Sequence, residues 1–91
     1  MTFVGEAQVT LSVELCGKLA DTVGDKIEIP VPQAGCNVST LFSLVAENHA
    51  MLAAEIGTGR VKACVNEVIV TRDAHVMPSD EVALFPPVSG G

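Results

Sequence analysis

The sequence has few of the residues that most often recognise nucleic acids and anionic surfaces. It contains no Trp, no Tyr and three Phe, and five Lys and Arg stand against eleven Asp and Glu, for a formal net charge of −6. The chain therefore offers few aromatic rings to stack on bases and few cations to bind phosphates. We expect no nucleic-acid or membrane binding, and an acidic surface better suited to a basic protein partner.

Long apolar runs and metal-type spacings are missing as well. No apolar stretch approaches transmembrane length, and the first seven residues lack the basic residue and apolar run of a secretory signal. Neither the cysteines (Cys16, Cys36 and Cys64) nor the histidines (His49 and His75) show ligand spacing. We expect no metal site, reduced and mostly buried thiols in a cytoplasmic protein, and histidines at the surface or at a helix end.

The sequence is nevertheless apolar enough to fold. Ninety-one residues with a hydrophobic fraction of 48% suit one small domain with one core built mainly from aliphatic side chains. We divide it into a short N-terminal leader over residues 1–8, a folded domain over 9–85 and a projecting tail over 86–91.

Alternation of apolar and polar residues predicts the strands. Period-two patterns cover residues 9–15, 26–31 and 61–65, and a further strand closes the domain at 82–85. A short strand at 68–71 follows a tight turn. In the last strand the alternation turns two side chains inward and the Phe that follows them outward.

Helical spacing predicts one main helix over residues 38–45, with Asn37 as its N-cap, and a short second helix over 51–56. Residues 17–24 are predicted to be a connection. The stretch 72–81 is predicted to be a polar loop held by Val76 and Met77 as a hydrophobic anchor.

The order of these elements is strand, strand, helix, strand, short strand, strand. The first two strands form a hairpin, and Pro30 and Pro32 make the second an edge strand or mark its end. The helix is the crossover that makes the first and last strands parallel neighbours. This predicts an α+β fold: a β-grasp (ubiquitin-like) roll with a mixed sheet of about four to five strands and one main helix packed on one face.

The chain shows no self-contained catalytic site. The cysteines have no local signature of a nucleophile, and the glycine-rich stretch 57–59 lacks the Lys-Ser/Thr pair of a phosphate loop. The acidic pair Asp80-Glu81 precedes a strand, where we expect it to shape a loop rather than to transfer protons. We expect a protein that is not an enzyme on its own and that binds no cofactor itself.

The C-terminal segment is the remaining candidate. Phe85 is followed by Pro86 and Pro87, which restrict the backbone, and then by Val88, Ser89, Gly90 and Gly91. An extended tail of this length reaches roughly 20 Å. The Gly91 carboxylate would be the reactive group, Gly90 would give access to a narrow channel, and Val88 and Ser89 would add side-chain specificity. The alternative is an ordinary frayed terminus.

A carboxylate is a poor electrophile until one of its oxygens becomes a good leaving group, most directly through adenylation by ATP. A nucleophile such as a persulfide sulfur could then displace AMP. Nothing in the sequence binds ATP in a recognisable way, so the activating machinery must belong to a partner.

The segment from Asp80 to Gly91 resembles the C-terminus of the MoaD family, the small sulfur-carrying subunits of molybdopterin synthase. Residues 62–67 resemble the strand that ends in Val-Asn before a tight turn in that family, and residues 11–24 fit its first strand and loop. Where the family often has an aromatic residue followed by Ala, this chain has Cys16-Gly17.

The resemblance implies a sulfur carrier in molybdenum cofactor biosynthesis. A MoeB-like, E1-type activating enzyme would adenylate Gly91 with ATP and magnesium, and a persulfide donor would convert it to a thiocarboxylate. The tail would then enter a MoaE-like large subunit, which holds the catalytic pocket, and donate sulfur to cyclic pyranopterin monophosphate. The family complex is a heterotetramer of two small and two large subunits.

Residues and resemblance together suggest a partner-binding patch at the base of the tail, formed by Phe85, Ile69 and Cys16 and continued by the tail from Pro86 to Ser89. The alternative for Phe85 and Ile69 is that they are ordinary core residues. For the function, the alternatives are a sulfur carrier of another pathway such as thiamine thiazole, a ubiquitin-like protein modifier, or a plain binding module.

Overall fold

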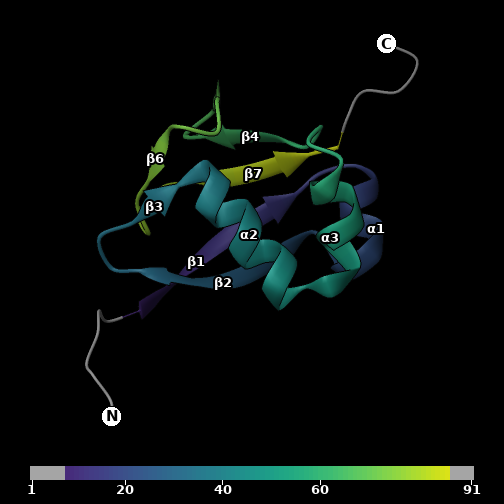
Figure 1. Cartoon of the computed structure of the whole chain (residues 1–91), viewed down its shortest axis with the longest axis horizontal. Helices are drawn as coiled ribbons and strands as arrows, with labels where there is room; N and C mark the ends of the chain where they lie inside the picture. Colours follow the sequence, from purple (N-terminus) through teal and green to yellow (C-terminus); the bar gives the residue numbers. More distant parts are fainter. Residues whose placement is uncertain (1–7, 87–91) are drawn as a thin grey trace.

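The structure, a computed structural model, describes residues 8–86. It confirms the predicted β-grasp class, with helices packed on one face of a mixed five-stranded sheet in the order β2-β1-β7-β4-β5 (Figure 1). The strands of this sheet are β1 (Gln8–Leu15), β2 (Lys26–Pro32), β4 (Lys62–Val65), β5 (Val68–Val70) and β7 (Val82–Phe85).

The pairing of the strands follows the predicted topology. β1 and β2 form an antiparallel hairpin, and β1 runs parallel to β7, with Leu15 opposite Leu84. β4 is antiparallel to both β7 and β5. β2 lies at one edge of the sheet, where Pro30 and Pro32 are tolerated because no further strand needs their missing N–H groups. β1 starts at Gln8, one residue before the predicted start of the domain.

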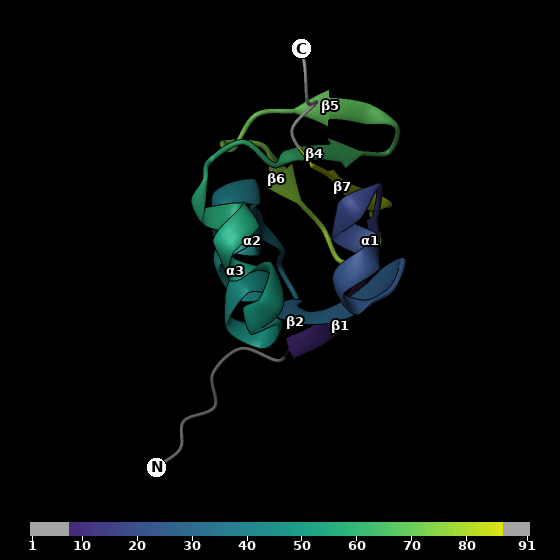
Figure 2. The same cartoon turned by 90° about the vertical axis from the view of Figure 1, so that its right-hand side faces the viewer.

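Two consecutive helices cover one face of the sheet (Figure 2). α2 (Val38–Asn48) is the predicted main helix, and Asn37 caps it as expected, since its Oδ1 accepts a 2.8 Å hydrogen bond from the Thr40 N–H. α3 (Ala50–Gly57) is the predicted short second helix. His49 joins the two as a helix-end residue, as predicted.

The structure also contains three short elements that the sequence patterns did not predict. The predicted connection after β1 contains the six-residue helix α1 (Lys18–Val23), whose single buried residue, Leu19, leaves too little periodicity to recognise. β3 (Cys36–Asn37) and β6 (His75–Val76) form a separate two-stranded sheet.

The predicted hydrophobic anchor of the loop over 72–81 is half right. Val76 is 1% exposed and belongs to the core, but Met77 is 41% exposed, so its assignment to the anchor was wrong. Val76 is held in β6, opposite Cys36, and Met77 is the first residue after that strand.

The core lies between the sheet and the helices and is mainly aliphatic. Burial of each large apolar side chain contributes on the order of 1.5–3 kcal/mol before the cost of chain entropy. The side chains exposed by less than 2% come from β1, α1, β2, α2, α3, β6 and β7: Leu11, Val13, Leu19, Ile29, Val31, Val38, Leu41, Val45, Leu52, Val76 and Leu84.

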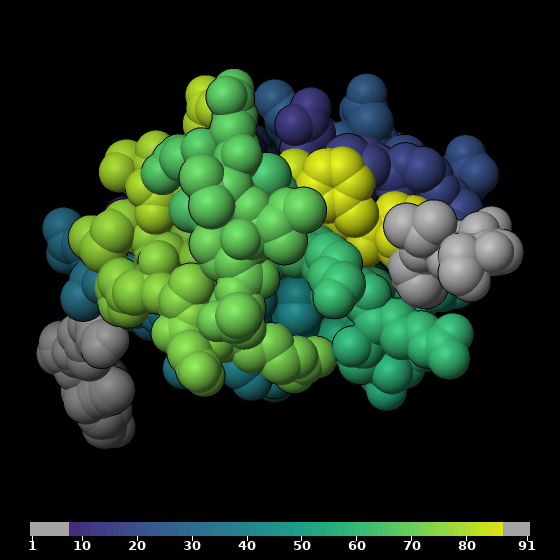
Figure 3. All heavy atoms as spheres, turned by 90° about the horizontal axis from the view of Figure 1, so that it is seen from above, coloured from purple at the N-terminus to yellow at the C-terminus, as the bar shows by residue number. Residues whose placement is uncertain are grey.

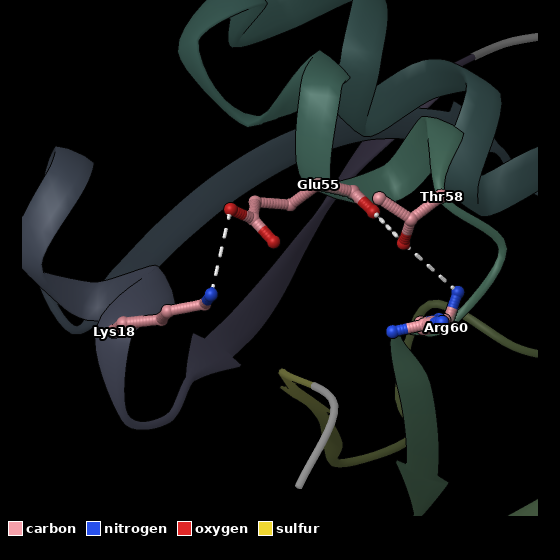
Figure 4. Close-up of polar contacts among 4 residues, drawn as sticks. All are labelled: Lys18, Glu55, Thr58 and Arg60. Carbon is pink, nitrogen blue, oxygen red and sulfur yellow. Dashed lines mark hydrogen bonds and ion pairs between the residues drawn. The ribbon is translucent and has the colours of Figure 1, made fainter. Parts of the chain in front are cut away.

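A chain of polar contacts joins α1 to the end of α3 (Figure 4). Lys18 Nζ lies 3.8 Å from Glu55 Oε2, and the Glu55 carbonyl accepts a 2.7 Å hydrogen bond from the Thr58 hydroxyl. The same hydroxyl oxygen accepts a 3.1 Å bond from the Arg60 N–H. The ion pair is exposed and adds little stability, but the Thr58 bonds satisfy backbone groups where α3 ends.

Within residues 8–86, the helices are all too short or too polar to span a lipid bilayer.

Candidate functional site

The base of the predicted tail lies at the end of β7. Phe85 is the last residue of that strand and is 36% exposed, while Val82 and Leu84 are buried, so the alternation predicted from the sequence is confirmed. Pro86 is the last described residue. The other predicted tail residues lie outside the described residues: Pro87, Val88, Ser89, Gly90 and Gly91.

Cys16 lies beside Phe85. The parallel pairing of Leu15 with Leu84 is extended by a 3.0 Å hydrogen bond from the Cys16 N–H to the Leu84 carbonyl. Because Leu15 and Leu84 face the core, the next residue on each strand faces the opposite side of the sheet. The structure therefore brings two of the three predicted docking residues together on the outer face, the one that the helices leave open.

Ile69 lies on the same outer face but farther away. It is 70% exposed and stands opposite Cys64, which in turn stands opposite Ala83 of β7. The residue opposite Phe85 on β4 is Lys62, so a whole strand separates the Ile69 backbone from the tail base. The predicted patch is a band that runs from the end of β1 across β7 and β4 to β5, rather than a compact cluster.

The outer face is hollowed between Ile69 and the β1–β2 hairpin. A groove of about 490 Å³ is lined by both uncharged and charged side chains, and most of the charged ones are acidic. The uncharged residues include Cys16, Cys64, Ala83 and Phe85. The charged residues are Glu14, Glu67, Asp80 and Glu81, with Lys26 as the single cation.

Sequence reasoning missed Cys64 and Ala83. The signal was available, because Ala63 and Val65 are buried and Val82 and Leu84 alternate with Ala83. The residues between them had to point to the open side of the sheet.

The three thiols are more accessible than predicted. Cys16, Cys36 and Cys64 are each half-buried, so the expectation of mostly buried thiols was wrong. Burial raises the pKa of the Cys16 thiol, and the negative charge of Glu14 and the neighbouring Cys64 raise it further. Burial alone raises the pKa of Cys36. Thiols with raised pKa values are poor nucleophiles near neutral pH, which does not favour covalent catalysis by either residue.

Gly17 lies beside Pro86 at the tail base. It has φ 58° and ψ −137°, a conformation that L side chains rarely adopt, and it precedes α1. A Cβ atom on Gly17 would lie 3.1 Å from Pro86 Cγ and 3.5 Å from its Cδ. The absence of a side chain therefore lets the chain leave β7 close to the β1–α1 corner. In the sequence, Gly17 looked only like part of a loop.

Asn66 forms hydrogen bonds to the two residues that precede β7. It has φ 52° and Glu67 has φ 71°, so these two residues form the predicted tight turn between β4 and β5. The Asn66 side chain donates to Asp80 Oδ1 at 3.2 Å and accepts from the Glu81 N–H at 2.9 Å, while its backbone N–H donates to the Glu81 carbonyl at 2.7 Å.

Asp80 completes this link. Its carboxylate accepts a 2.8 Å bond from the Met77 N–H, and this backbone bond is the main reason that its pKa is lowered. The bond from Asn66 and the charge of His75 lower it further. The acidic pair before β7 thus shapes a loop, as the sequence suggested. Asp80 holds the strand that leads to the tail.

Other candidate chemistry is not supported in the described part of the chain. No group of three or more His, Cys, Asp or Glu side chains within residues 8–86 is arranged to hold a metal ion. His75 is exposed, as predicted, and its Nε2 lies 2.9 Å from the Ala34 carbonyl, to which the ring can donate.

Solved structures from archaea share this fold. The crystal structure of small archaeal modifier protein 1 from Haloferax volcanii is 22% identical, with a TM-score of 0.74, and the match covers 91% of this chain and 100% of that one. Small archaeal modifier protein 1 from Methanosarcina acetivorans is 18% identical, with a TM-score of 0.70, over 93% of this chain and 99% of that one.

A putative molybdopterin converting factor subunit 1 from Pyrococcus furiosus is 25% identical, with a TM-score of 0.72, over 88% of this chain and 99% of that one. No curated protein sequence matches the chain at a significant level.

The sequence identifies the family to which the chain belongs. The profile of the ThiS family matches residues 13–91, which includes all of the outer-face groove except Ser12 and continues through the tail. Members of this group are small ThiS/MoaD-like sulfur carriers or ubiquitin-like modifiers and are not catalytic enzymes themselves. The chain belongs to the ThiS family of β-grasp proteins.

Proposed function

We propose that this protein is the sulfur carrier of molybdenum cofactor biosynthesis, with Gly91 as the residue that carries the sulfur. The observation that supports this most directly is the arrangement at the end of β7, where the chain leaves the sheet at Pro86 beside an outer-face groove with exposed Phe85 and half-buried Cys16. A partner that docks on this groove would receive the following residues as an arm.

The proposed chemistry starts at the Gly91 carboxylate. Its oxygen attacks the α-phosphate of ATP, with magnesium, in a MoeB-like activating enzyme, which forms an acyl adenylate and releases pyrophosphate. The terminal sulfur of a donor persulfide then attacks the acyl carbon and displaces AMP. A second thiol cleaves the resulting acyl disulfide and leaves a thiocarboxylate on Gly91.

The thiocarboxylate is the form that would enter a MoaE-like large subunit and pass its sulfur to cyclic pyranopterin monophosphate. Gly90 gives the arm the narrow profile that such a channel requires. The chemistry needs ATP and reduced thiols, so we place the protein in the cytoplasm. The likeness to the Pyrococcus furiosus molybdopterin converting factor subunit supports this branch over thiamine thiazole synthesis.

The charge around the groove supports a basic partner. Four carboxylates and one lysine line the groove, so a complementary surface would carry Lys or Arg. We expect association with the activating enzyme to slow as salt rises, because screening acts first on the rate of encounter.

The direct test is the intact mass of the protein after co-expression with a MoeB-like enzyme and a cysteine desulfurase. Replacement of one oxygen by sulfur at Gly91 is expected, and a variant that lacks Gly90 and Gly91 should show none. Phe85→Ala should weaken binding to a MoaE-like subunit by tenfold or more, about 1.4 kcal/mol. Glu47→Ala, an exposed change on α2, is the control and should bind normally. An unmodified Gly91 under these conditions would contradict the proposal.

The second candidate is a ubiquitin-like protein modifier, which the likeness to the two small archaeal modifier proteins favours. It predicts conjugates of high mass in which Gly91 is joined to lysines of other proteins. Such conjugates without any thiocarboxylate-dependent synthesis of molybdopterin would favour this candidate over the sulfur carrier.

A further inference from the structure

The two edges of the main sheet differ in how they are protected. β2 carries Pro30 and Pro32, which hinder the addition of another strand. β5 has no proline, and its residues Val68 and Ile69 are 59% and 70% exposed. An exposed apolar edge of this kind is a template for strand addition.

The backbone of Ile69 faces outward along this edge. In a two-residue hairpin the flanking residues, here Val65 and Val68, form a hydrogen-bonded pair, and the next pair, Cys64 and Ile69, does not. The N–H and carbonyl of Ile69 therefore point away from β4. Within residues 8–86, no hydrogen bond joins them to another element.

A second groove, of about 300 Å³, runs between this edge and the start of α2. Val70, Val38 and Phe42 contribute apolar walls. In Figure 3, the blue-teal atoms of the first part of α2 lie at the bottom of a recess between green segments of the chain. An added strand along β5 would place alternate side chains over this groove.

The groove is basic although the protein is acidic. Lys62 and Arg72 line it, and Arg60 lies between two other lining residues, so three of the five cationic residues gather here. The Arg72 guanidinium lies 4.9 Å from the centre of the Phe42 ring. None of these three cations forms an ion pair with another described residue.

The positive charge comes from side chains rather than from the end of α2. The first N–H groups of the helix are already bonded, to the Ala74 carbonyl, the Arg72 carbonyl and Asn37 Oδ1. Lys62 and Arg72 remain available for carboxylates, and Arg can bind one with two parallel hydrogen bonds.

We propose that the β5 edge and this groove bind an extended acidic segment of a partner protein as a sixth strand. The open backbone of Ile69 supplies two hydrogen bonds, the groove receives an apolar side chain, and Lys62 and Arg72 pair with flanking carboxylates. A second copy of this chain fits poorly, because pairing β5 with β5 would bring two sets of these cations together. A nucleic acid fits poorly because no exposed aromatic side chain lies in the groove to stack on a base.

This surface is separate from the chemistry proposed for Gly91. The groove lies at the sheet edge and on the helix side, whereas the tail base lies in the middle of the sheet, on the open side. Lys62 adjoins both surfaces, because it lines the groove and stands opposite Phe85. The carrier could therefore hold a second protein while its tail is engaged.

The test is a titration of the full chain with the acetylated peptide Asp-Glu-Val-Ile-Val-Asp-Glu, followed by the amide signals in ¹⁵N–¹H spectra. Shifts are expected at Ile69, Val70 and Thr71 and not on β2. The double variant Lys62→Gln and Arg72→Gln should weaken binding by about tenfold or more. The control is the double variant Lys18→Gln and Lys26→Gln, which removes the same charge elsewhere on the protein. It should change the affinity for the peptide by less than about threefold.

A second probe tests strand addition itself. The same peptide, N-methylated on alternate amides in two complementary versions, should lose binding in the version whose methyl groups face β5. Equal binding of all three peptides, or an unchanged affinity of the double variant, would overturn the proposal. So would tighter binding of an oligouridylate at the same amides, or shifts of Ile69 with protein concentration alone, which would indicate a nucleic acid or a second copy as the occupant. Formation of the Gly91 thiocarboxylate is measured separately, so a negative result in the peptide titration leaves the sulfur-carrier proposal unaffected.

Discussion

Replacing Gly17 by Ala should disturb the tail without unfolding the domain. Gly17 adopts φ 58° and ψ −137°, and an L residue held in such a conformation costs about 1–3 kcal/mol. The new Cβ would also lie 3.1 Å from Pro86 Cγ, so Pro86 must shift by a few tenths of an ångström. The ring of Pro86 is stiff, and the displacement would pass to the residues that follow it.

The expected loss of stability is large but tolerable. Domains of this size have a free energy of unfolding of about 5–15 kcal/mol, and each kcal/mol lowers Tm by roughly 4–8 °C. Gly24→Ala is a matched control. Gly24 has φ 102° and ψ 173°, which is equally unfavourable for an L residue, but a Cβ there meets nothing within 4 Å.

The assay compares thermal unfolding with the rate of ATP-dependent adenylation by a MoeB-like enzyme, at a temperature at which both variants are folded. Both should lose stability to a similar degree, and only Gly17→Ala should be adenylated more slowly. Equal adenylation rates for the two variants would refute the idea that Gly17 positions the tail. A slow Gly24→Ala would show that the assay reports stability alone.

Three further predictions concern the surroundings of the groove. Asn66→Gly keeps the positive φ but removes the side-chain hydrogen bonds to the residues before β7, so urea unfolding should show a free energy of unfolding lower by about 1–2 kcal/mol. Asn66→Ala should lower this free energy further, because Ala strains the turn. Equal losses for the two variants would contradict this role of Asn66. The pKa of Asp80 is lowered, chiefly by a backbone hydrogen bond, so its contribution to stability is present above the unfolded value of about 3.9 and is lost as the pH falls through its folded pKa. Asp80→Asn should therefore flatten the acid side of the stability curve, and an unchanged slope would argue against this role. Glu14 raises the pKa of Cys16, so Glu14→Gln should speed alkylation of Cys16 by iodoacetamide near pH 8 and leave Cys36 unchanged, as followed by peptide mass mapping.

Local periodicity determined most of the secondary structure. Alternation in residues 9–15 and 82–85 marks which side chains face the core, and burial of an apolar face is the dominant favourable term in folding. The outward position of Phe85 follows from the buried Val82 and Leu84 alone. Helix α1 could not be recognised in this way, because six residues with one buried side chain carry no repeating pattern.

The tail motif was likewise visible in the sequence. The run from Asp80 to Gly91 carries the family resemblance, and the profile match over residues 13–91 extends through it. The acidic composition also pointed to a basic partner, but it did not show that most of the cations gather on one side.

Only the tertiary structure decided which residues become neighbours. Cys16 meets Phe85, Gly17 meets Pro86 and the Asn66 side chain bonds the residues before β7, because the parallel pairing of β1 with β7 and the antiparallel pairing of β4 with β7 bring distant segments together. A period of two tells which way a side chain points and says nothing about what lies across the strand. The register of the strands depends on the whole sheet. It sets which side chains lie side by side in the outer-face groove and along the basic edge at β5.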